Sequence, residues 1–276
     1  MRALLVACTL MAGSGVWSTA GAAACTRGSS ALDAQFERLR QTQPEQVKAA
    51  LDAIDGFGRK LLALRSYLRQ QNIAARWSWT QVQIDAYQRS PEYQTLLAEI
   101  DAIRVRFESA NPGYQLYANT DVRSLDQQIA RWNENREVAS IAAALQVQSC
   151  AGVSPQRREA LRTFLLAWQP PARAPLAAPG LSLHGRARAI DFQIHQGSRV
   201  VAGPETARIE TDWVRQGWSG KLASAIRGAS RKFDGPLRSP DEPWHYEYDP
   251  QQDSGQPLHI MRGLRKIISE SPVRNT

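Results

Sequence analysis

Apolar residues recur at helical spacing through residues 30–110. They form two stripes in which neighbouring members lie three, four or seven residues apart, or directly adjacent, as on one face of a helix. The first stripe consists of Val47, Leu51, Ile54, Leu61 and Leu68, and the second of Leu96, Leu97, Ile100, Ile103 and Phe107. The pattern predicts antiparallel helices that bury both stripes in a common core, with a coiled-coil surface for a partner protein as the alternative.

Capping signals mark the ends of these helices. Ser78-x-x-Gln81 matches a capping box, and Ser90-Pro91 places a cap directly before a helix-starting proline. Asn111-Pro112-Gly113 is a strong turn signal. We therefore predict a domain boundary at residues 110–111, with an N-terminal helical region over residues 25–110.

Beyond this boundary, helical segments alternate with short strands. Strands are predicted over residues 114–117, 187–194 and 244–248, and helices from Ser124 toward Cys150, from Ser154 to about Trp168, and over residues 218–233. A segment rich in proline and alanine, residues 169–180, predicts an irregular loop. This order favours an α+β fold, in which residues 111–276 form a second domain with a small antiparallel sheet flanked by helices.

The first residues are typical of a secretory signal peptide. Arg2 gives a positive start, residues 3–17 are apolar, and Ala22-Ala23-Ala24 offers the small residues that signal peptidase prefers. A buried N-terminal helix is the alternative interpretation. No apolar run approaches the length of about 20 residues needed to span a bilayer. We predict that residues 1–24 are removed and that the mature protein is exported to the periplasm.

Two cysteines, Cys25 and Cys150, remain after the signal peptide is removed. An even number of cysteines in an oxidising compartment predicts a disulfide between them. In the competing interpretation Cys25 is a lipidated first residue that anchors the chain. Ala22 stands where a lipoprotein signal usually has leucine, which favours the disulfide.

Composition and charge narrow the choice of partners. With 276 residues, of which 43% are hydrophobic and 22% charged, the chain is an ordinary globular protein. Its 34 basic residues are spread among 26 acidic ones, and no long basic run occurs, so nucleic acid is not predicted as a partner. The formal charge of +8 suits an acidic cell-wall polymer or an anionic membrane surface equally well.

The histidines carry the chemical signal. His184 is followed by Asp191, and His245 lies far downstream, directly after Glu242-Pro-Trp. Two imidazoles and one carboxylate make a three-ligand zinc set that leaves a fourth position for water. A carboxylate three residues before the last ligand is placed to act as the general base, Glu242. His195 shares a strand face with Asp191, but a structural or surface role is expected.

These residues resemble a known family. The pattern Ser-x-His-x-x-Gly-x-Ala-x-Asp followed by Glu-x-Trp-His is that of the zinc D-Ala-D-Ala carboxypeptidases and dipeptidases, which cleave peptidoglycan and share a superfamily with hedgehog and lysostaphin-type domains. It matches Ser182, His184, Ala189, Asp191, Glu242, Trp244 and His245. Upstream, Arg123-Ser124 with Gln128 resembles the family's Arg-Ser turn. Ala187 departs from the pattern, because the family has glycine there.

The resemblance implies a mechanism and a substrate. One zinc per chain would be held by His184, Asp191 and His245, and Glu242 would assist the attack of zinc-bound water on an amide of a peptidoglycan stem peptide. Arg123 would stabilise the oxyanion or bind the substrate. Ser182 would hydrogen-bond the substrate backbone, or else merely cap a turn. The expected activity is that of a D-alanyl-D-alanine carboxypeptidase.

Other functions stay open at this point. One alternative is that the protein is an enzyme of the same fold that acts as a peptidoglycan endopeptidase or as an L,D-carboxypeptidase. Alternatively, the fold recognises the cell wall without cutting it, although an intact Glu242 argues against this. In a third class of function, the protein has a structural or partner-binding role that depends mainly on its N-terminal helices. Nothing in the sequence indicates the oligomeric state.

Overall fold

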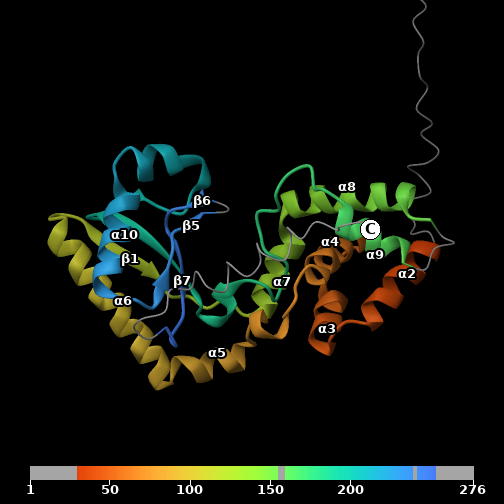
Figure 1. Ribbon diagram of the computed structural model, residues 1–276, viewed down its shortest axis with the longest axis horizontal. Coiled ribbons are helices and arrows are strands. Elements are labelled where there is room, and N and C mark those ends of the chain that lie inside the picture. Colours follow the sequence, from red (N-terminus) through yellow and green to blue (C-terminus); the bar gives the residue numbers. More distant parts are fainter. Residues whose placement is uncertain (1–29, 155–158, 239–240, 253–276) are drawn as a thin grey trace, which may run out of the picture. The chain divides into compact units, whose positions relative to one another are not determined.

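The computed structural model describes residues 30–154, 159–238 and 241–252 (Figure 1). The chain forms two compact units, each assembled from two separate stretches of sequence. One unit contains the described residues up to Gln70 together with Asn133–Leu176, and the other contains Gln71–Trp132 and the described residues from Ala177 onward. The predicted boundary at residues 110–111 is therefore wrong, because it falls inside the second unit. The predicted signal peptide, Cys25 and His259 lie outside the described residues.

The first unit is helical. Its helices are α2 (Ser30–Gln41), α3 (Glu45–Ala53), α4 (Phe57–Leu68), α8 (Arg136–Gly152) and α9 (Ala160–Ala167). Helix α4 packs against α3, α8 and α9, and α2 packs against α9. A buried amide joins three of its segments, because Gln35 donates to the carbonyl of Ser154 and accepts from the backbone N–H of Leu161, each at 3.0 Å.

The second unit contains the sheet and the helices that cover it. The strands of its main sheet are β1 (Gln115–Asn119), β2 (Ala189–Gln196), β3 (Arg199–Ala202), β4 (Phe233–Asp234) and β7 (His245–Tyr248). Strand β2 is central: β1 pairs along one edge, while β7 and β3 pair with successive parts of the other edge, and β4 extends the sheet beyond β7. All pairings are antiparallel, so the predicted α+β class with a small antiparallel sheet is confirmed.

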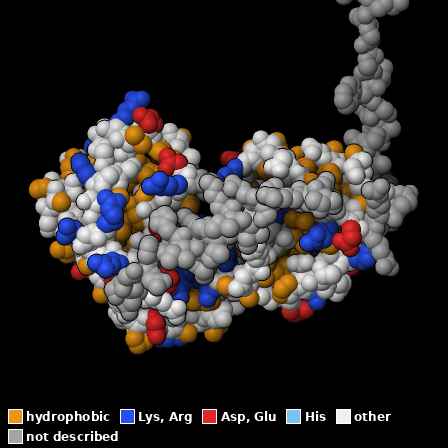
Figure 2. All heavy atoms as spheres, in the orientation of Figure 1, with side chains coloured by type: hydrophobic (Ala, Val, Ile, Leu, Met, Phe, Trp, Pro, Cys, Tyr) orange, Lys and Arg blue, Asp and Glu red, His pale blue; other side chains and the backbone are white. Residues whose placement is uncertain are grey.

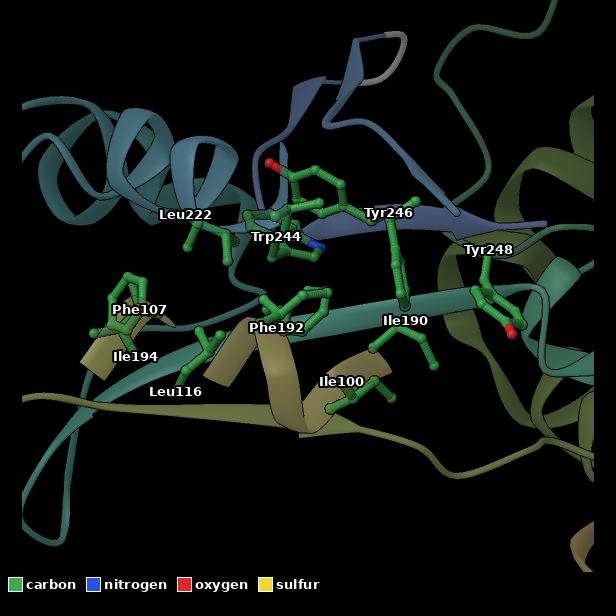
Figure 3. Close-up of a cluster of buried hydrophobic side chains, with 14 of the residues drawn as sticks. Ile100, Phe107, Leu116, Ile190, Phe192, Ile194, Leu222, Trp244, Tyr246 and Tyr248 are labelled. Atoms are coloured by element: carbon green, nitrogen blue, oxygen red, sulfur yellow. The ribbon is translucent and has the colours of Figure 1, made fainter. Parts of the chain in front are cut away.

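The core of this unit lies between one face of the sheet and two helices, α6 (Pro91–Ala110) and α10 (Trp218–Ala229). Alternate residues of β2 point into it, because successive side chains of a strand face opposite sides. Figure 3 shows side chains from both helices and from β1, β2 and β7 converging there. The labelled members are Ile100, Phe107, Leu116, Ile190, Phe192, Ile194, Leu222, Trp244, Tyr246 and Tyr248.

The two apolar stripes are mostly buried, but in separate cores. Most of the first stripe is buried in the helical unit, whereas the second lies on α6 against the sheet. The prediction that both stripes of residues 30–110 are buried in one core is therefore wrong. Periodicity identifies the buried face of each helix and carries no information about which neighbour covers it.

Capping signals in the sequence predicted two of the helix starts correctly. Ser90 caps α6 before Pro91, and Ser124 forms a capping box with Gln127 before α7 (Leu125–Glu134). The predicted box at Ser78 is wrong. Helix α5 (Gln81–Gln88) begins two residues later than that box requires, because Thr80 and Gln83 form its capping box instead.

Basic side chains do not gather into one patch on the face seen in Figure 2, where they lie singly among acidic and neutral residues. This distribution agrees with the absence of a long basic run in the sequence. Within the described part of the chain, no helix is both long enough and apolar enough to cross a membrane.

Candidate metal centre

Strand pairing brings the first two donor residues together. In the antiparallel ladder between β2 and β7, Asp191 stands directly opposite His245. Directly opposed residues have Cβ atoms about 4.5–5.5 Å apart and share one face of the sheet. Asp191 Oδ1 and His245 Nδ1 lie 2.9 Å apart as a result. Both side chains point away from the face that Phe192 and Tyr246 bury in the core, since they alternate with those residues.

The third donor comes from the segment just before β2. His184 lies in a short 3-10 helix, η2 (Leu183–Arg186), and its Nε2 atom is 3.3 Å from His245 Nδ1 and 3.4 Å from Asp191 Oδ2. The three side chains are mostly buried, with His184 only 11% exposed. The predicted ligands therefore converge on one point, and together they could hold a metal ion.

The spacing of the three donors matches a small tetrahedral ion. Zinc bonds of about 2.0–2.1 Å at tetrahedral angles place neighbouring donor atoms about 3.3 Å apart. The imidazole nitrogens of His184 and His245 are 3.3 Å apart, and the two oxygens of Asp191 lie 2.9 Å from His245 Nδ1 (Oδ1) and 3.4 Å from His184 Nε2 (Oδ2). One donor atom from each residue lies within 4.8 Å of the other two. Two imidazoles and one carboxylate are also the donor types that zinc takes in hydrolytic sites.

The protonation states also suit metal binding. Burial lowers the pKa of His184 to about 3, and the charges of Arg123 and His245 act in the same direction against the opposing effect of Asp191. Burial by itself would raise the pKa of Asp191, but the hydrogen bond to His245 and the nearby His184, His245 and Arg123 together lower it. At neutral pH the site thus presents a neutral imidazole and a carboxylate, the forms that bind metals.

Glu242 lies beside this triad without belonging to it. It is placed by a short hairpin of β5 (Leu237–Arg238) and β6 (Asp241–Glu242), and its Oε2 atom is 3.8 Å from His245 Nδ1. Its side chain is 28% exposed, more than those of the three donors. The group of three donors does not include Glu242, whose carboxylate nevertheless lies close enough to His245 to contact a small ligand held by the donors.

Arg123 is held next to the triad by its backbone. Its N–H donates to the carbonyl of His184 at 3.3 Å, which ties the turn before α7 to η2. Its half-buried guanidinium has a lowered pKa, caused first by burial and then by Arg131, while Asp191 acts in the opposite direction. An arginine stays protonated despite such a shift, so Arg123 places a positive charge near the donors.

The structure places Ser182 and His195 outside the group of three donors. Ser182 occupies the N-cap of η2, but its side chain makes no capping hydrogen bond, so the turn-capping alternative is wrong. His195 lies further along β2, where its ring is 5.7 Å from the ring of Tyr117 and its Nε2 is 3.3 Å from Gln193 Oε1. It is not part of the donor group, as expected.

Cys150 lies in α8, and the predicted disulfide stays a prediction because Cys25 is outside the described residues.

A buried polar cluster beneath η2 was not predicted. Ser78 Oγ donates to the carbonyl of Ser182 at 3.2 Å, and Gln128 Nε2 donates to Ser78 Oγ at 2.9 Å and to the carbonyl of Arg123 at 2.8 Å. The Gln128 oxygen accepts from the backbone N–H of Gly180 at 3.1 Å. We call Ser78 and Gln128 the clamp, because they fasten the segments that carry His184 and Arg123.

The clamp was missed although the sequence held a signal for it. Ser78 was interpreted as a helix cap, yet Thr80-x-x-Gln83 matches the same capping pattern two residues later. With the cap assigned to Thr80, Ser78 is a polar residue without a local role, and it is only 2% exposed. Gln128 formed part of the noted resemblance but had no role assigned.

Ala187 closes the turn between η2 and β2 in a left-handed conformation, with φ of 52° and ψ of 33°. It is the sole residue other than glycine with positive φ in the part of the chain described. Such a conformation favours glycine, which the resembled family has at this position. Alanine adopts this conformation here, and its side chain is buried.

The chain was compared with known proteins at three levels. No family model, curated protein or solved structure matches it. The resemblance to zinc D-Ala-D-Ala peptidases therefore stays a prediction based on the residues named above.

Proposed function

We propose that this protein is a zinc-dependent peptidase that cleaves peptidoglycan stem peptides, acting as a D-alanyl-D-alanine carboxypeptidase. The observation that carries the proposal is the convergence of His184, Asp191 and His245, with Glu242 next to them. Support also comes from the order and spacing of these residues, which resemble the pattern of that family.

The donor set favours zinc and a hydrolytic reaction. Two imidazoles and a carboxylate also bind iron in non-haem oxygenases, so the ligands alone do not choose the chemistry. The second carboxylate, Glu242, at 3.8 Å from His245 Nδ1, gives the site a base that hydrolysis needs. When bound, a zinc ion would polarise a substrate carbonyl and lower the pKa of a coordinated water molecule.

The residues of the chain would then have separate tasks. Glu242 would accept a proton at a carboxylate oxygen from the attacking water and pass it to the nitrogen of the departing amine, as general base and then general acid. Arg123 would face the negative charge that develops on the carbonyl oxygen, a stabilisation commonly worth about 3–4 kcal/mol. The clamp would keep His184 and Arg123 at a fixed separation through their backbones.

The setting of the reaction is also part of the proposal. Residues 1–24 resemble a secretory signal peptide, and stem peptides are found outside the cytoplasm, so we infer a periplasmic enzyme. Lipid anchoring through Cys25 is the alternative for the mature chain.

One experiment joins metal content to cleavage. The mature chain is purified, its zinc is counted by atomic emission, and it is incubated with isolated peptidoglycan and defined stem peptides whose products are identified by mass. One zinc per chain and release of terminal D-alanine are expected. The matched control is Glu242→Gln, which keeps the donors and removes the base.

Each other outcome selects a different function. Larger fragments would identify an endopeptidase, and release of D-alanine from a tetrapeptide stem would identify an L,D-carboxypeptidase. Bound zinc without any cleavage would refute the peptidase proposal and favour a cell-wall-binding module.

A further inference from the structure

A cavity with a volume of about 540 Å³ opens beside Arg123. It lies between α5 and α7 and the segment that leads into α7. Its lining residues are Gln81, Ile84, Gln88, Asp121, Val122, Arg123, Gln127, Ala130 and Arg131. The volume is within the range of small-molecule sites, about 300–1,000 Å³, and far exceeds what a lone carboxylate group needs.

The charges around this cavity are unbalanced. Arg123 and Arg131 both line it, and Arg131 is near enough for its charge to act on Arg123. Asp121 is the single acid in the lining. Among the described residues, neither of the two arginines forms a salt bridge with a carboxylate. The charge of the exposed Arg131 acts unfavourably on Arg123, whereas Asp191 at the metal centre acts favourably, and an anion bound between the two arginines would add to that favourable effect.

The cavity is connected to the metal centre through Arg123. The backbone N–H of this residue donates to the carbonyl of His184, and Arg123 is also one of the residues that line the cavity. Arg131 lies on α7, six residues beyond Leu125, the first residue of that helix. Neither the three donor residues nor Glu242 are among the residues that line the cavity. A group bound beside Arg131 would therefore belong to a part of the substrate beyond the residues at the cleaved bond.

We propose that this cavity binds an internal carboxylate of the substrate, a side-chain or α-carboxyl group two or more residues from the cleaved bond, and that Arg131 is its specificity-determining residue. The planar guanidinium fork matches a carboxylate with two parallel hydrogen bonds. The inference rests on the proposed function, since it adds a second point of recognition to the same substrate.

The test compares two peptides that differ in one group. The first is the stem pentapeptide L-Ala-γ-D-Glu-L-Lys-D-Ala-D-Ala, and the second carries an amide in place of the α-carboxylate of D-Glu. Both are given to the zinc-loaded wild-type protein, to Arg131→Gln, and to the control Arg199→Gln. Arg199 is exposed on β3 and distant in sequence from the cavity, so the control removes the same charge without touching the lining.

The expected result is a change in KM confined to one peptide. For Arg131→Gln, the KM of the carboxylate peptide should rise about tenfold, as for a lost charge-assisted hydrogen bond, with kcat within twofold. The KM of the amidated peptide should stay within twofold, and Arg199→Gln should match the wild type. Equal effects on both peptides, or none on either, would overturn the inference while leaving the peptidase proposal intact.

A binding measurement separates the two proposals if no cleavage occurs. Titration calorimetry of the same two peptides with the same three proteins does not depend on turnover. Tighter binding of the carboxylate peptide that Arg131→Gln abolishes would support the cavity even where the peptidase proposal has failed. Equal binding of both peptides, or no binding of either, would overturn it.

Discussion

A methyl group added at Gly185 tests how firmly the clamp holds the His184 segment. A Cβ atom at this position would lie 2.1 Å from Ser78 Oγ, 2.4 Å from Ser78 Cβ and 2.5 Å from Gln128 Nε2. All three separations are below normal contact, so the clamp or η2 has to move. Both clamp side chains are buried and hydrogen-bonded, and neither can swing into solvent.

The magnitude follows from two contributions. Overpacking a buried site costs about 1–3 kcal/mol. Displacing Ser78 also breaks one or two hydrogen bonds, each worth about 1 kcal/mol. We therefore expect Gly185→Ala to lower the free energy of unfolding by about 2–5 kcal/mol, measured by urea denaturation. Zinc affinity, measured by competition with a chelator, should fall at least tenfold because His184 moves with its neighbour.

A second substitution shows whether the cause is the clamp. Ser78→Gly removes two of the three close contacts, so the double variant should be more stable than Gly185→Ala alone, with a coupling energy of about 1–3 kcal/mol. Gly220→Ala is the matched control. Gly220 lies in α10 with no atom within 4 Å of an added Cβ, so this change should be neutral or stabilise by up to about 1 kcal/mol. A Gly185→Ala protein within about 0.5 kcal/mol of the wild type would refute the reasoning.

Three further predictions concern the metal centre, and one concerns the cysteines. Glu242→Gln should keep a full equivalent of zinc and lose roughly 100- to 10,000-fold in kcat, because the donors survive and the base does not; retained turnover would remove Glu242 from its role. His184→Ala should bind less than one equivalent of zinc in atomic emission, and a full equivalent would show that the ligand set is wrong. In metal-free protein the folded-state pKa of His184 lies at about 3, below its ordinary 6.5, so the unfolded chain binds more protons between these values. Stability should then be fully present above pH 6.5 and fall by roughly 1 kcal/mol per pH unit toward pH 3, a slope that urea titrations of His184→Gln should lack. Reduction should lower the melting temperature if Cys25 and Cys150 are bridged, since a loop of about 125 residues corresponds to roughly 5 kcal/mol; two free thiols in the purified mature protein would reject the bridge.

The sequence predicted the metal donors better than the division of the chain. His184, Asp191 and His245 were predicted from their donor types and spacing together with the resemblance to a zinc peptidase pattern, and strand alternation put Asp191 on the same face as His195. The register that sets Asp191 opposite His245 is a long-range property, and no pattern within either strand contains it.

The predicted division of the chain into two domains was wrong for a similar reason. The turn at Asn111-Pro112-Gly113 is real, but it connects α6 to β1 inside one unit. Helix α8 was expected with the sheet and packs instead on α4. An amphipathic helix encodes the face that it buries and not the partner that covers it. The clamp escaped detection because its value lies in contacts between residues fifty positions apart, such as Ser78 and Gln128.

The interleaved path of the chain has a consequence for the order of events during synthesis. All residues of the helical unit have been made once Leu176 has been added, whereas the three donors come later, and the last of them, His245, belongs to the final described strand. Residues 71–132, which carry α5, α6, β1 and Arg123, must wait for these later strands before their apolar surfaces are covered. Since domains generally fold as units while the chain emerges, the group of three donors can be completed only after the helical unit. A chain truncated shortly before His245 would hold a complete helical unit and a sheet without its donor strand.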